Sequence, residues 1–363
     1  MYYMTSSKKI LIYHLASLGD ILVALPALRI IRENYKHCQI TMLTAKHDNP
    51  GAVDARQVLD GINVVDEYIY LNLNYDQIKM YRETFKEVRQ GKYSVVIYLN
   101  EGRKIRQIIR DRFFFKLCGI SEIIGAGLSA KLRNPIVDSA GNSESMRAFL
   151  VRKIKKIGSL NVDSFDVYGI KLKNITKHSW INERLSQKLI DNDRNKIISF
   201  SIGTKLEVKD WGNDRWIELI EKISSSYPKY LIVAIGGEYD KDKSDILFEN
   251  VCANYINFCG ALTIPQSAYI LSRSKIFVCH DSGPMHLSAA IGVKTISIFS
   301  SRSAPGLWFP AGDNNKVFYT RIECEGCEKI RCISLKKRCI RAISVNEVFE
   351  ELKSSIKLID KGV

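Results

Sequence analysis

The sequence predicts an α/β fold built from two doubly wound, Rossmann-like domains. Short apolar runs alternate with helical patterns from residue 8 to residue 127, as expected of a parallel sheet covered by helices. The alternation loosens into polar residues at 159–195 and then restarts. With 363 residues, the chain has about the length of two ordinary domains. We expect both domains to present the carboxyl ends of their strands to a shared cleft.

The first domain is expected to hold a five-stranded parallel sheet. Buried strands are recognised as short apolar runs, and helices as apolar residues spaced three or four apart. The predicted strands are 8–15, 39–44, 64–71, 93–100 and 122–127, and the predicted helices are 21–34, 75–90 and 104–119.

The second domain repeats this pattern. Its predicted strands are 195–203, 230–238, 275–283 and 294–301, and its predicted helices are 215–227, 264–274, 284–292 and 344–360. We therefore expect an N-terminal domain over 1–175 and a second domain over 176–345. A terminal segment, 346–363, remains, and its packing back on the first domain is one option.

The formal net charge of +15 favours anionic partners. The Lys and Arg residues are scattered, and no motif that reads nucleic acid is present. An anionic membrane surface or a phosphorylated glycolipid is therefore expected in preference to nucleic acid. No apolar run has the length of a membrane span, and the N-terminus lacks the layout of a signal peptide. We expect a cytoplasmic chain, peripheral on the inner face of the membrane if it binds lipid.

The segment 280–292 has the features of a phosphate-binding strand-to-helix turn. A buried strand is followed at once by Asp281, Ser282 and Gly283, and Pro284 suits the start of a helix. The backbone N–H groups of Ser282 and Gly283 are then free at a helix N-terminus, which stabilises a diphosphate. The alternative is an ordinary helix cap, which does not call for a His at position 286.

A second candidate lies after the first strand. Asp20 follows that strand on a turn that Gly19 permits, so its carboxylate is expected at the cleft. The alternative is that Asp20 caps the helix 21–34.

Residues 281–287, Asp-Ser-Gly-Pro-Met-His-Leu, followed by Ala-Ala-x-Gly, resemble the signature of the ADP-heptose:lipopolysaccharide heptosyltransferase family (glycosyltransferase family 9). The likeness extends along most of the chain, in the right order. It includes Ser17-Leu18-Gly19-Asp20-Ile21 with Pro26-Ala27-Leu28, Lys209-Asp210-Trp211 with Trp216, and Gly236-Gly237-Glu238. The resemblance implies the GT-B fold, a metal-independent reaction and no cofactor.

The resemblance also implies roles for individual residues. Asp20 matches the general base that accepts the proton of the acceptor hydroxyl, and Ser17 matches a loop position near the donor phosphates or the acceptor. Lys209 matches a cation that stabilises the leaving diphosphate, and Trp211, unusual in a mobile loop, favours that role over a solvated lysine. The predicted donor-binding residues are Ser17, Gly19, Thr204, Lys209, Glu238, Leu262, Asp281, Ser282, Gly283 and His286. Within this set, Glu238 is expected at the ribose and Leu262 at the nucleobase.

The resemblance predicts an inverting glycosyltransferase that moves heptose from ADP-heptose to a lipopolysaccharide-core or related acceptor. Two alternatives stay open: another nucleotide sugar as donor, and a nucleotide-sugar epimerase of the same architecture. A dehydrogenase is disfavoured because no G-x-G-x-x-G follows the first strand.

The chain has nine cysteines, four of them clustered as Cys324-x2-Cys327-x4-Cys332-x6-Cys339. This spacing is compatible with a four-thiolate zinc site. Packed free thiols are the favoured reading and paired cysteines the least favoured, because the expected compartment is reducing. The other five, Cys38, Cys118, Cys252, Cys259 and Cys279, are expected in the core.

Three further segments leave alternatives open. The stretch 110–119 mixes cations with Phe113, Phe114 and Phe115, so it could dock on anionic lipid, lie beside the acceptor or pack its Phe residues inside. Residues 300–303 replace the Gly-Pro-Thr common in the family, and Arg302 there is either a phosphate ligand or solvated. The acidic triplet 191–193 is discounted as a metal site because it lies in the connector.

Overall fold

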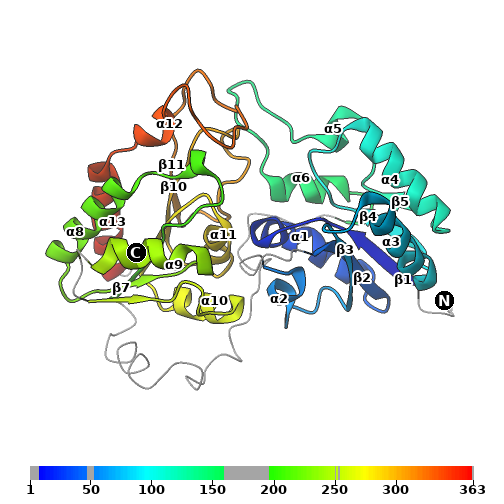
Figure 1. Ribbon diagram of the computed structural model, residues 1–363, viewed down its shortest axis with the longest axis horizontal. Helices are drawn as coiled ribbons and strands as arrows, with labels where there is room; N and C mark the ends of the chain where they lie inside the picture. The colour runs from blue at the N-terminus through cyan, green and yellow to red at the C-terminus, as the bar shows by residue number, and fades with distance from the viewer. Residues whose placement is uncertain (1–7, 47–52, 159–195, 250, 252–253, 362–363) are drawn as a thin grey trace. The chain divides into compact units, whose positions relative to one another are not determined.

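The computed structural model describes residues 8–46, 53–158, 196–249, 251 and 254–361. The chain divides into two compact units, Met1–Tyr168 and Gly169–Val363, and both are α/β (Figure 1). The predicted connector at 159–195, with the acidic triplet 191–193 inside it, lies outside the described residues.

The first unit contains a fully parallel five-stranded sheet in the order β3-β2-β1-β4-β5. Chain order reverses between β1 and β4, so the connections that follow these two neighbouring strands leave toward opposite faces of the sheet. The strands are β1 (Lys9–Tyr13), β2 (Gln39–Lys46), β3 (Glu67–Asn72), β4 (Val95–Tyr98) and β5 (Glu122–Ile124).

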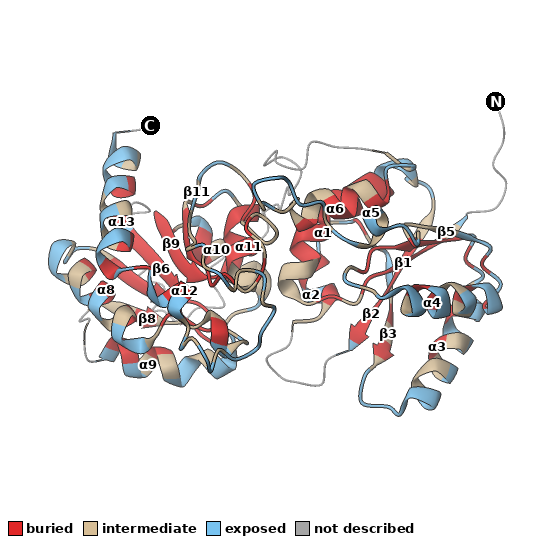
Figure 2. Cartoon of the chain, turned by 90° about the horizontal axis from the view of Figure 1, so that it is seen from above, coloured by how far each residue is buried: buried red, intermediate tan, exposed pale blue. Residues whose placement is uncertain are grey.

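Helices cover both faces of this sheet (Figure 2). They are α1 (Leu18–Asn34), α2 (Ala55–Leu59), α3 (Gln77–Gly91), α4 (Ile105–Leu117), α5 (Ala130–Arg133) and α6 (Met146–Lys153). Helices α3 and α4 supply Val88, Ile108 and Phe115 to the core on one face. Helix α1 packs against α2 and α6 over the other face, and ten of its seventeen residues are buried.

The second unit contains a parallel six-stranded sheet in the order β11-β10-β9-β6-β7-β8. This is the strand order of a dinucleotide-binding Rossmann sheet, with its reversal between β6 and β9. The strands are β6 (Ile197–Ser201), β7 (Leu231–Ala234), β8 (Tyr255–Asn257), β9 (Ile276–His280), β10 (Thr295–Ile298) and β11 (Asn315–Phe318).

The second unit is completed by eight helical segments in its described part. They are η5 (Glu207–Lys209), α8 (Asn213–Ser226), η6 (Glu238–Asp240), α9 (Lys241–Glu249), α10 (Ile264–Ser272), α11 (Gly283–Ala290), α12 (Arg338–Arg341) and α13 (Val345–Asp360). Helix α13 packs against α8 and adds Val348, Leu352 and Ile356 to the core of this unit. Whether the end of the chain also meets the first domain stays a prediction.

Every predicted strand and helix of the described residues is present, with shifted ends. The structure adds α2, α5, α6, β8, α9, β11 and α12, which the sequence pattern did not indicate. Across the described residues, no helix combines the length and apolar character that crossing a membrane requires.

Candidate active-site residues at the strand ends of both units

In the first unit, the segments that follow β1 and β4 are joined at the point where strand order reverses. The backbone N–H of Leu15 donates to Oδ1 of Asn100 at 2.7 Å. Ligands of open α/β sheets bind outside the carboxyl ends of strands at such a reversal. Polar side chains at this edge are therefore candidates for substrate contact.

Asp20 lies in the first turn of α1, and Ser17 is the N-cap residue. Oδ2 of Asp20 accepts hydrogen bonds from the backbone N–H of Ser17 at 2.8 Å and from the Ser17 hydroxyl at 2.7 Å. The two positions expected for Asp20, on a turn before the helix and at the helix cap, are both wrong. The helix begins at Leu18 because the Ser17–Asp20 exchange closes its first turn. Within the described residues, Oδ1 of Asp20 carries no hydrogen bond.

Two buried side chains beside Asp20 have an unpartnered polar atom in the described part of the chain: Nδ1 of His14 and Nδ2 of Asn100. His14 is fully buried, and its Nε2 lies 3.4 Å from the carbonyl oxygen of Asp20. A buried polar group without a partner costs about 1–3 kcal/mol, so these two atoms are a local cost to the fold that the described residues do not offset. The sequence analysis missed both residues, although Asn100 follows a buried strand just as Asp20 does.

Two ionisable groups add to this edge. Lys153 of α6 is 5% exposed, and its Nζ donates to the carbonyl oxygen of Asn100 at 2.6 Å. Burial lowers the pKa of Lys153 to about 8. Burial also raises the pKa of Glu101, a shift that His14 opposes and the Asp20 carboxylate increases. The edge therefore holds two ionisable groups whose pKa values burial displaces toward their neutral forms.

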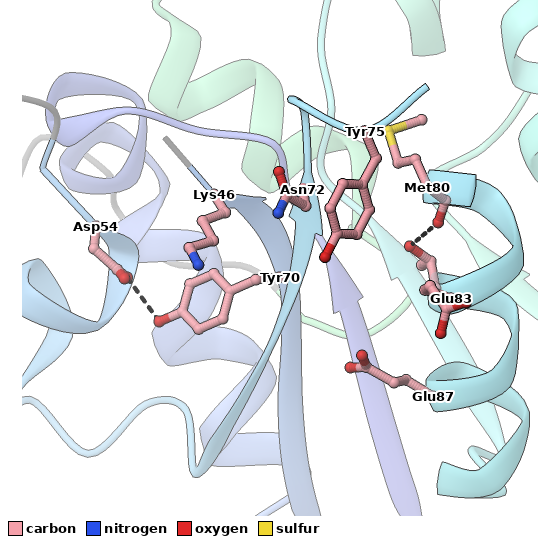
Figure 3. A pocket seen from close by; sticks show the side chains of 9 residues that line it. Lys46, Asp54, Tyr70, Asn72, Tyr75, Met80, Glu83 and Glu87 are labelled. Carbon is pink, nitrogen blue, oxygen red and sulfur yellow. Dashed lines mark hydrogen bonds between the residues drawn. The ribbon is translucent and has the colours of Figure 1, made fainter. Parts of the chain in front are cut away.

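The first unit also has a polar pocket of about 400 Å³ near the ends of β2 and β3 (Figure 3). Tyr70 and Tyr75 contribute aromatic rings, and the Tyr70 hydroxyl donates to Oδ1 of Asp54 at 2.8 Å. Glu83 and Glu87 of α3 lie on its other side. Carboxylates with tyrosines suit a hydroxyl-rich ligand. No predicted site residue lines this pocket.

In the second unit, β9 leads directly into α11. Ser282 is the N-cap residue in extended conformation, and the helix begins at Gly283, so Pro284 is its second residue. The first backbone N–H groups of α11 have no partner inside the helix by its geometry. Ser282 and Gly283 are partly exposed, whereas Asp281 is 6% exposed. The turn is thus placed as expected for a backbone anion site.

Lys209 and Asp281 form an ion pair across the β6–β9 edge. Nζ of Lys209 lies 2.6 Å from Oδ2 of Asp281 and 3.4 Å from its carbonyl oxygen. The two side chains are 15% and 7% exposed, so Lys209 is not a solvated surface residue. The carboxylate holds the ammonium group beside the N-terminus of α11.

Trp211 is a core residue and not part of a mobile loop, which corrects the expectation. Its side chain is fully buried, and its Nε1–H donates to the carbonyl oxygen of Ile343 at 3.0 Å. Its backbone N–H donates to Nε2 of His280 at 3.0 Å, and its ring meets Trp216 edge-on at 5.1 Å. Burial lowers the pKa of His280 to about 4, so this ring is a neutral acceptor that fixes the Lys209 segment on β9.

The acidic residue nearest the ends of β6 and β7 is Asp240, which the sequence analysis missed. Its Oδ2 accepts from the backbone N–H of Gly237 at 2.9 Å. A Cβ atom at Gly203 would overlap the Asp240 carboxylate, and one at Gly236 would lie 2.6 Å from it. Burial raises the pKa of Asp240. Glu238 is instead exposed at the start of η6.

The predicted ribose and nucleobase segments lie side by side. Gly260 adopts φ +73°, and a Cβ atom there would lie 2.9 Å from Cα of Glu238. Leu262 is partly exposed just before α10, and Thr204 is partly exposed just after β6. His286 is 7% exposed within α11, where its ring lies 6.3 Å from that of Trp308.

Three of the four clustered cysteines lie in a loop that docks on the Lys209 segment, and Cys339 lies in α12. Cys324, Cys327 and Cys332 are partly exposed and Cys339 is buried. Partial burial and the three neighbouring sulfurs raise the pKa of Cys324. Within the described residues, no three His, Cys, Asp or Glu side chains are arranged to hold a metal ion. Of the five single cysteines, Cys252 lies outside the described residues and Cys38 is only partly buried.

Arg302 is tied to this cysteine loop. Its Nη2 lies 2.8 Å from Oε2 of Glu328, and its Nε donates to the carbonyl oxygen of Lys329 at 3.0 Å. The side chain is 15% exposed, so it is not simply solvated. The residues that depart from the family pattern thus hold the loop in place.

Residues 123–338 match the family model described as glycosyltransferase family 9 (heptosyltransferase), which is more than half of the chain. Two curated relatives are lipooligosaccharide heptosyltransferase 2 of Campylobacter jejuni subsp. jejuni, serotypes O:2 and O:6. They are 23% and 22% identical over 182 and 178 residues, which are 48% and 47% of this chain and 55% and 54% of theirs. The chain thus spans about half the length of the curated relatives it matches.

Solved structures share the fold along nearly the whole chain. A family 9 glycosyltransferase from Veillonella parvula superposes with TM-score 0.70 at 20% identity, covering 97% of this chain and 98% of its own. The E. coli ADP-heptose LPS heptosyltransferase II gives 0.64 at 16% identity, covering 97% and 99%. The E. coli heptosyltransferase WaaC with ADP gives 0.62 at 18% identity, covering 96% and 99%.

These similarities confirm the predicted α/β fold of the GT-B type, with two Rossmann-like units. The predicted family is also confirmed, because its model matches most of the second unit and the end of the first. The chain belongs to glycosyltransferase family 9, the heptosyltransferase family.

Proposed function

We propose that this chain transfers heptose from ADP-heptose to a hydroxyl group of a lipopolysaccharide-core acceptor, with inversion at the anomeric carbon. The family assignment supports a glycosyltransferase. The donor and acceptor follow the relatives, one solved with ADP and two named lipooligosaccharide heptosyltransferases. Another nucleotide sugar is the remaining alternative for the donor.

We assign the acceptor and the base to the first unit. In the proposed reaction, the acceptor oxygen attacks the anomeric carbon as the bond from that carbon to the diphosphate breaks. Asp20 takes the hydroxyl proton on Oδ1, since Oδ2 is engaged with Ser17. An ordinary carboxylate is a weak base, but the proton becomes acidic as the new C–O bond forms.

We assign the donor to the second unit. Lys209, held by Asp281, and the backbone N–H groups of Ser282 and Gly283 stabilise the diphosphate as it leaves. Thr204 and His286 border the diphosphate. Glu238 binds the ribose, and Leu262 contacts the nucleobase. These donors and the dipole of α11 supply the charge stabilisation, and no metal ion takes part in the proposed reaction.

The observation that carries the proposal is the Lys209–Asp281 pair beside the N-terminus of α11, in a chain of this family. Such a cation with free N–H groups is suited to a diphosphate leaving group. We further propose that the chain works at an anionic membrane surface, where a glycolipid acceptor would be met.

The test mixes the purified chain with ADP-heptose and a panel of truncated lipopolysaccharide acceptors, with a chelator present in one series. We expect an acceptor mass increase of one heptose, one ADP released per transfer and the inverted anomeric configuration by NMR. Nucleotide-sugar turnover at the same rate without acceptor would point to an epimerase or hydrolase and overturn the proposal.

A further inference from the structure

Helix α4 carries large apolar side chains on its solvent-exposed side. Ile105, Ile109, Phe113 and Leu117 are 44%, 52%, 63% and 51% exposed. They are spaced four residues apart, so they follow one another along the same side of the helix. Figure 2 shows this side of α4 largely exposed. We call these four residues the α4 stripe.

The stripe is separate from the face of α4 that holds the fold together. Ile108 and Phe115 are 2% and 1% exposed and belong to the core of the first unit. Phe114 packs its ring against Phe85 of α3. Of the three consecutive Phe residues, Phe114 and Phe115 therefore pack inside, whereas Phe113 of the stripe does not.

The charged residues interleaved with the stripe are all cations. At 100° per residue, Arg106 and Lys116 fall within the same exposed arc as the stripe, and Arg110 lies about 20° beyond its edge. Arg112 is partly buried and donates to the carbonyl oxygen of Ala126 at 3.1 Å. The acidic residue of α4, Asp111, is 3% exposed and is bonded to Arg110 at 2.7 Å. Among the described residues, neither Arg106 nor Lys116 has an ion-pair partner. The exposed arc thus combines apolar and cationic side chains without a carboxylate.

The neighbouring helix α3 shows how this chain builds a helix side that faces water. There Glu83 lies 3.3 Å from Arg82 and 3.5 Å from Lys86, so the two signs alternate and pair. Mixed signs are typical of a solvated helix surface. The exposed arc of α4 lacks this mixture of charges, so we expect it to face something other than water.

An arc of apolar and cationic side chains matches the surface of an anionic bilayer. The apolar groups reach the acyl boundary while the cations stay at the lipid phosphates. A second copy of this chain is a poor occupant, because a twofold contact would place the cations against each other. The 13-residue helix extends about 20 Å at 1.5 Å per residue, enough to lie in the membrane plane.

We propose that the exposed side of α4 docks on an anionic lipid bilayer, with Ile109 and Phe113 among the headgroups and Arg106 and Lys116 on lipid phosphates. The inference deepens the proposed function and rests on it for the glycolipid acceptor that brings the chain to a membrane. Its physical test does not require transfer activity.

The test measures flotation of the full chain with vesicles of phosphatidylglycerol and phosphatidylethanolamine, and with phosphatidylcholine vesicles. We expect binding to the anionic vesicles that weakens as salt rises, and at least tenfold weaker binding to phosphatidylcholine. The double variant Ile109→Glu/Phe113→Glu should lower the anionic-vesicle affinity at least tenfold. The double variant Arg106→Gln/Lys116→Gln should lower it severalfold.

Matched controls separate the stripe from net charge and general apolar exposure. Ile330→Glu/Ile333→Glu makes the same charge change at residues that are 64% and 85% exposed in the second unit, and should bind within twofold of wild type. Lys155→Gln/Lys156→Gln removes two exposed cations of the first unit and should also bind anionic vesicles within twofold of wild type. Equal losses of anionic-vesicle affinity in the stripe variants and in their controls would overturn the proposal.

Two more measurements decide the remaining outcomes. Phe113→Trp should show a blue-shifted emission with anionic vesicles, whereas Ile333→Trp should not, and no shift at position 113 would contradict the inference. Sedimentation should give the same oligomeric state for wild type and Ile109→Glu/Phe113→Glu, and a dimer lost in the variant would assign the stripe to self-association instead.

Transfer to a water-soluble truncated acceptor should persist in the Ile109→Glu/Phe113→Glu variant. If wild type binds vesicles but transfers no sugar, the proposed function fails while the docking surface stands.

Discussion

At the scale of single residues, Asp20 has two distinct carboxylate oxygens. Oδ2 holds the start of α1 through Ser17, and Oδ1 is free of hydrogen bonds within the described residues. We expect Asp20→Asn to lower kcat by roughly 10²–10⁴-fold, because the amide cannot accept the acceptor proton. Calorimetric affinity for ADP should stay within a factor of about three of wild type, because we assign the donor to the other unit.

The α13 helix offers a control for the structural part of this change. There Glu347 accepts from the backbone N–H of Ser344 at 2.9 Å and from its hydroxyl at 2.6 Å, the same exchange as in α1. Glu347→Gln should therefore cost a similar fraction of stability, about 0.5–2 kcal/mol, and leave kcat unchanged. If both variants lose activity in proportion to stability, Asp20 is a capping residue only.

Lys209 is expected to act on the leaving diphosphate and not on folding. We expect Lys209→Met to lower kcat by roughly 10²–10³-fold and to weaken ADP binding measured by calorimetry. Lys294→Met is the matched control, because Lys294 is 18% exposed and lies 3.6 Å from Glu351, a comparable ion pair away from the β6–β9 edge. An equal fall in kcat for both variants would remove Lys209 from the proposed mechanism.

Lys153 gives a pH dependence with a defined sign. Its folded-state pKa is about 8, below the ordinary lysine pKa of 10.5, because burial penalises the charge. Between these values the unfolded chain binds a proton that the folded chain does not, so stability from this group rises with pH. Relative to Lys153→Met, the free energy of unfolding of wild type should grow by about 2 kcal/mol between pH 8 and 9.5. Chemical denaturation at each pH measures this difference, and a flat or falling difference would contradict the assigned burial effect.

At the scale of elements, the sequence identifies best what is buried on both faces. β1, β6 and β9 are recognisable because every or nearly every residue is buried and most of the residues are apolar. The edge strands β8 and β11 are three and four residues long and partly exposed, so they leave no apolar run to detect. Short strands of this kind are identified only by their pairing with a neighbour.

The candidate site residues also divide into those that a local sequence pattern identifies and those that only tertiary packing brings together. Asp281 is readable because a polar residue directly follows a buried strand, and Asp20 because it follows a buried strand within a few residues. The role of His280 as an acceptor for the backbone of Trp211 joins residues 69 positions apart, which no local pattern reveals. Lys153 meets Asn100 from a helix that the pattern did not indicate. Contacts of this type depend on tertiary packing.

The loop that carries the clustered cysteines is bonded to the segment around η5. The backbone N–H of Val208 donates to the carbonyl oxygen of Ile330 at 3.1 Å, and Nζ of Lys337 lies 3.1 Å from Oε1 of Glu207. The loop therefore supports η5, which carries Lys209. We expect the purified chain to keep its Tm after treatment with a zinc chelator, and its thiols to react with a disulfide reagent once unfolded. One equivalent of zinc by metal analysis, with a Tm that falls on chelation, would assign the four thiolates to a zinc site.

At the scale of the whole molecule, two separate α/β units divide the work that the proposal requires. Each unit has its own core and its own reversal of strand order, β1 against β4 and β6 against β9. Because ligands of such sheets bind at the reversal, each substrate should protect one unit. ADP should slow backbone hydrogen exchange at residues 203–212 and 281–286 and leave residues 98–104 unchanged.

A truncated acceptor should give the reverse pattern in the same exchange experiment, with slower exchange at residues 14–20 and 98–104. The contrast is sharp because amide exchange reports local opening, and a ligand lowers opening only where it binds the folded form. Lys209→Met supplies the control, since it should reduce the protection by ADP and keep that by the acceptor. Protection by ADP at the β1–β4 edge would exchange the assignments of the two units and place Asp20 at the donor.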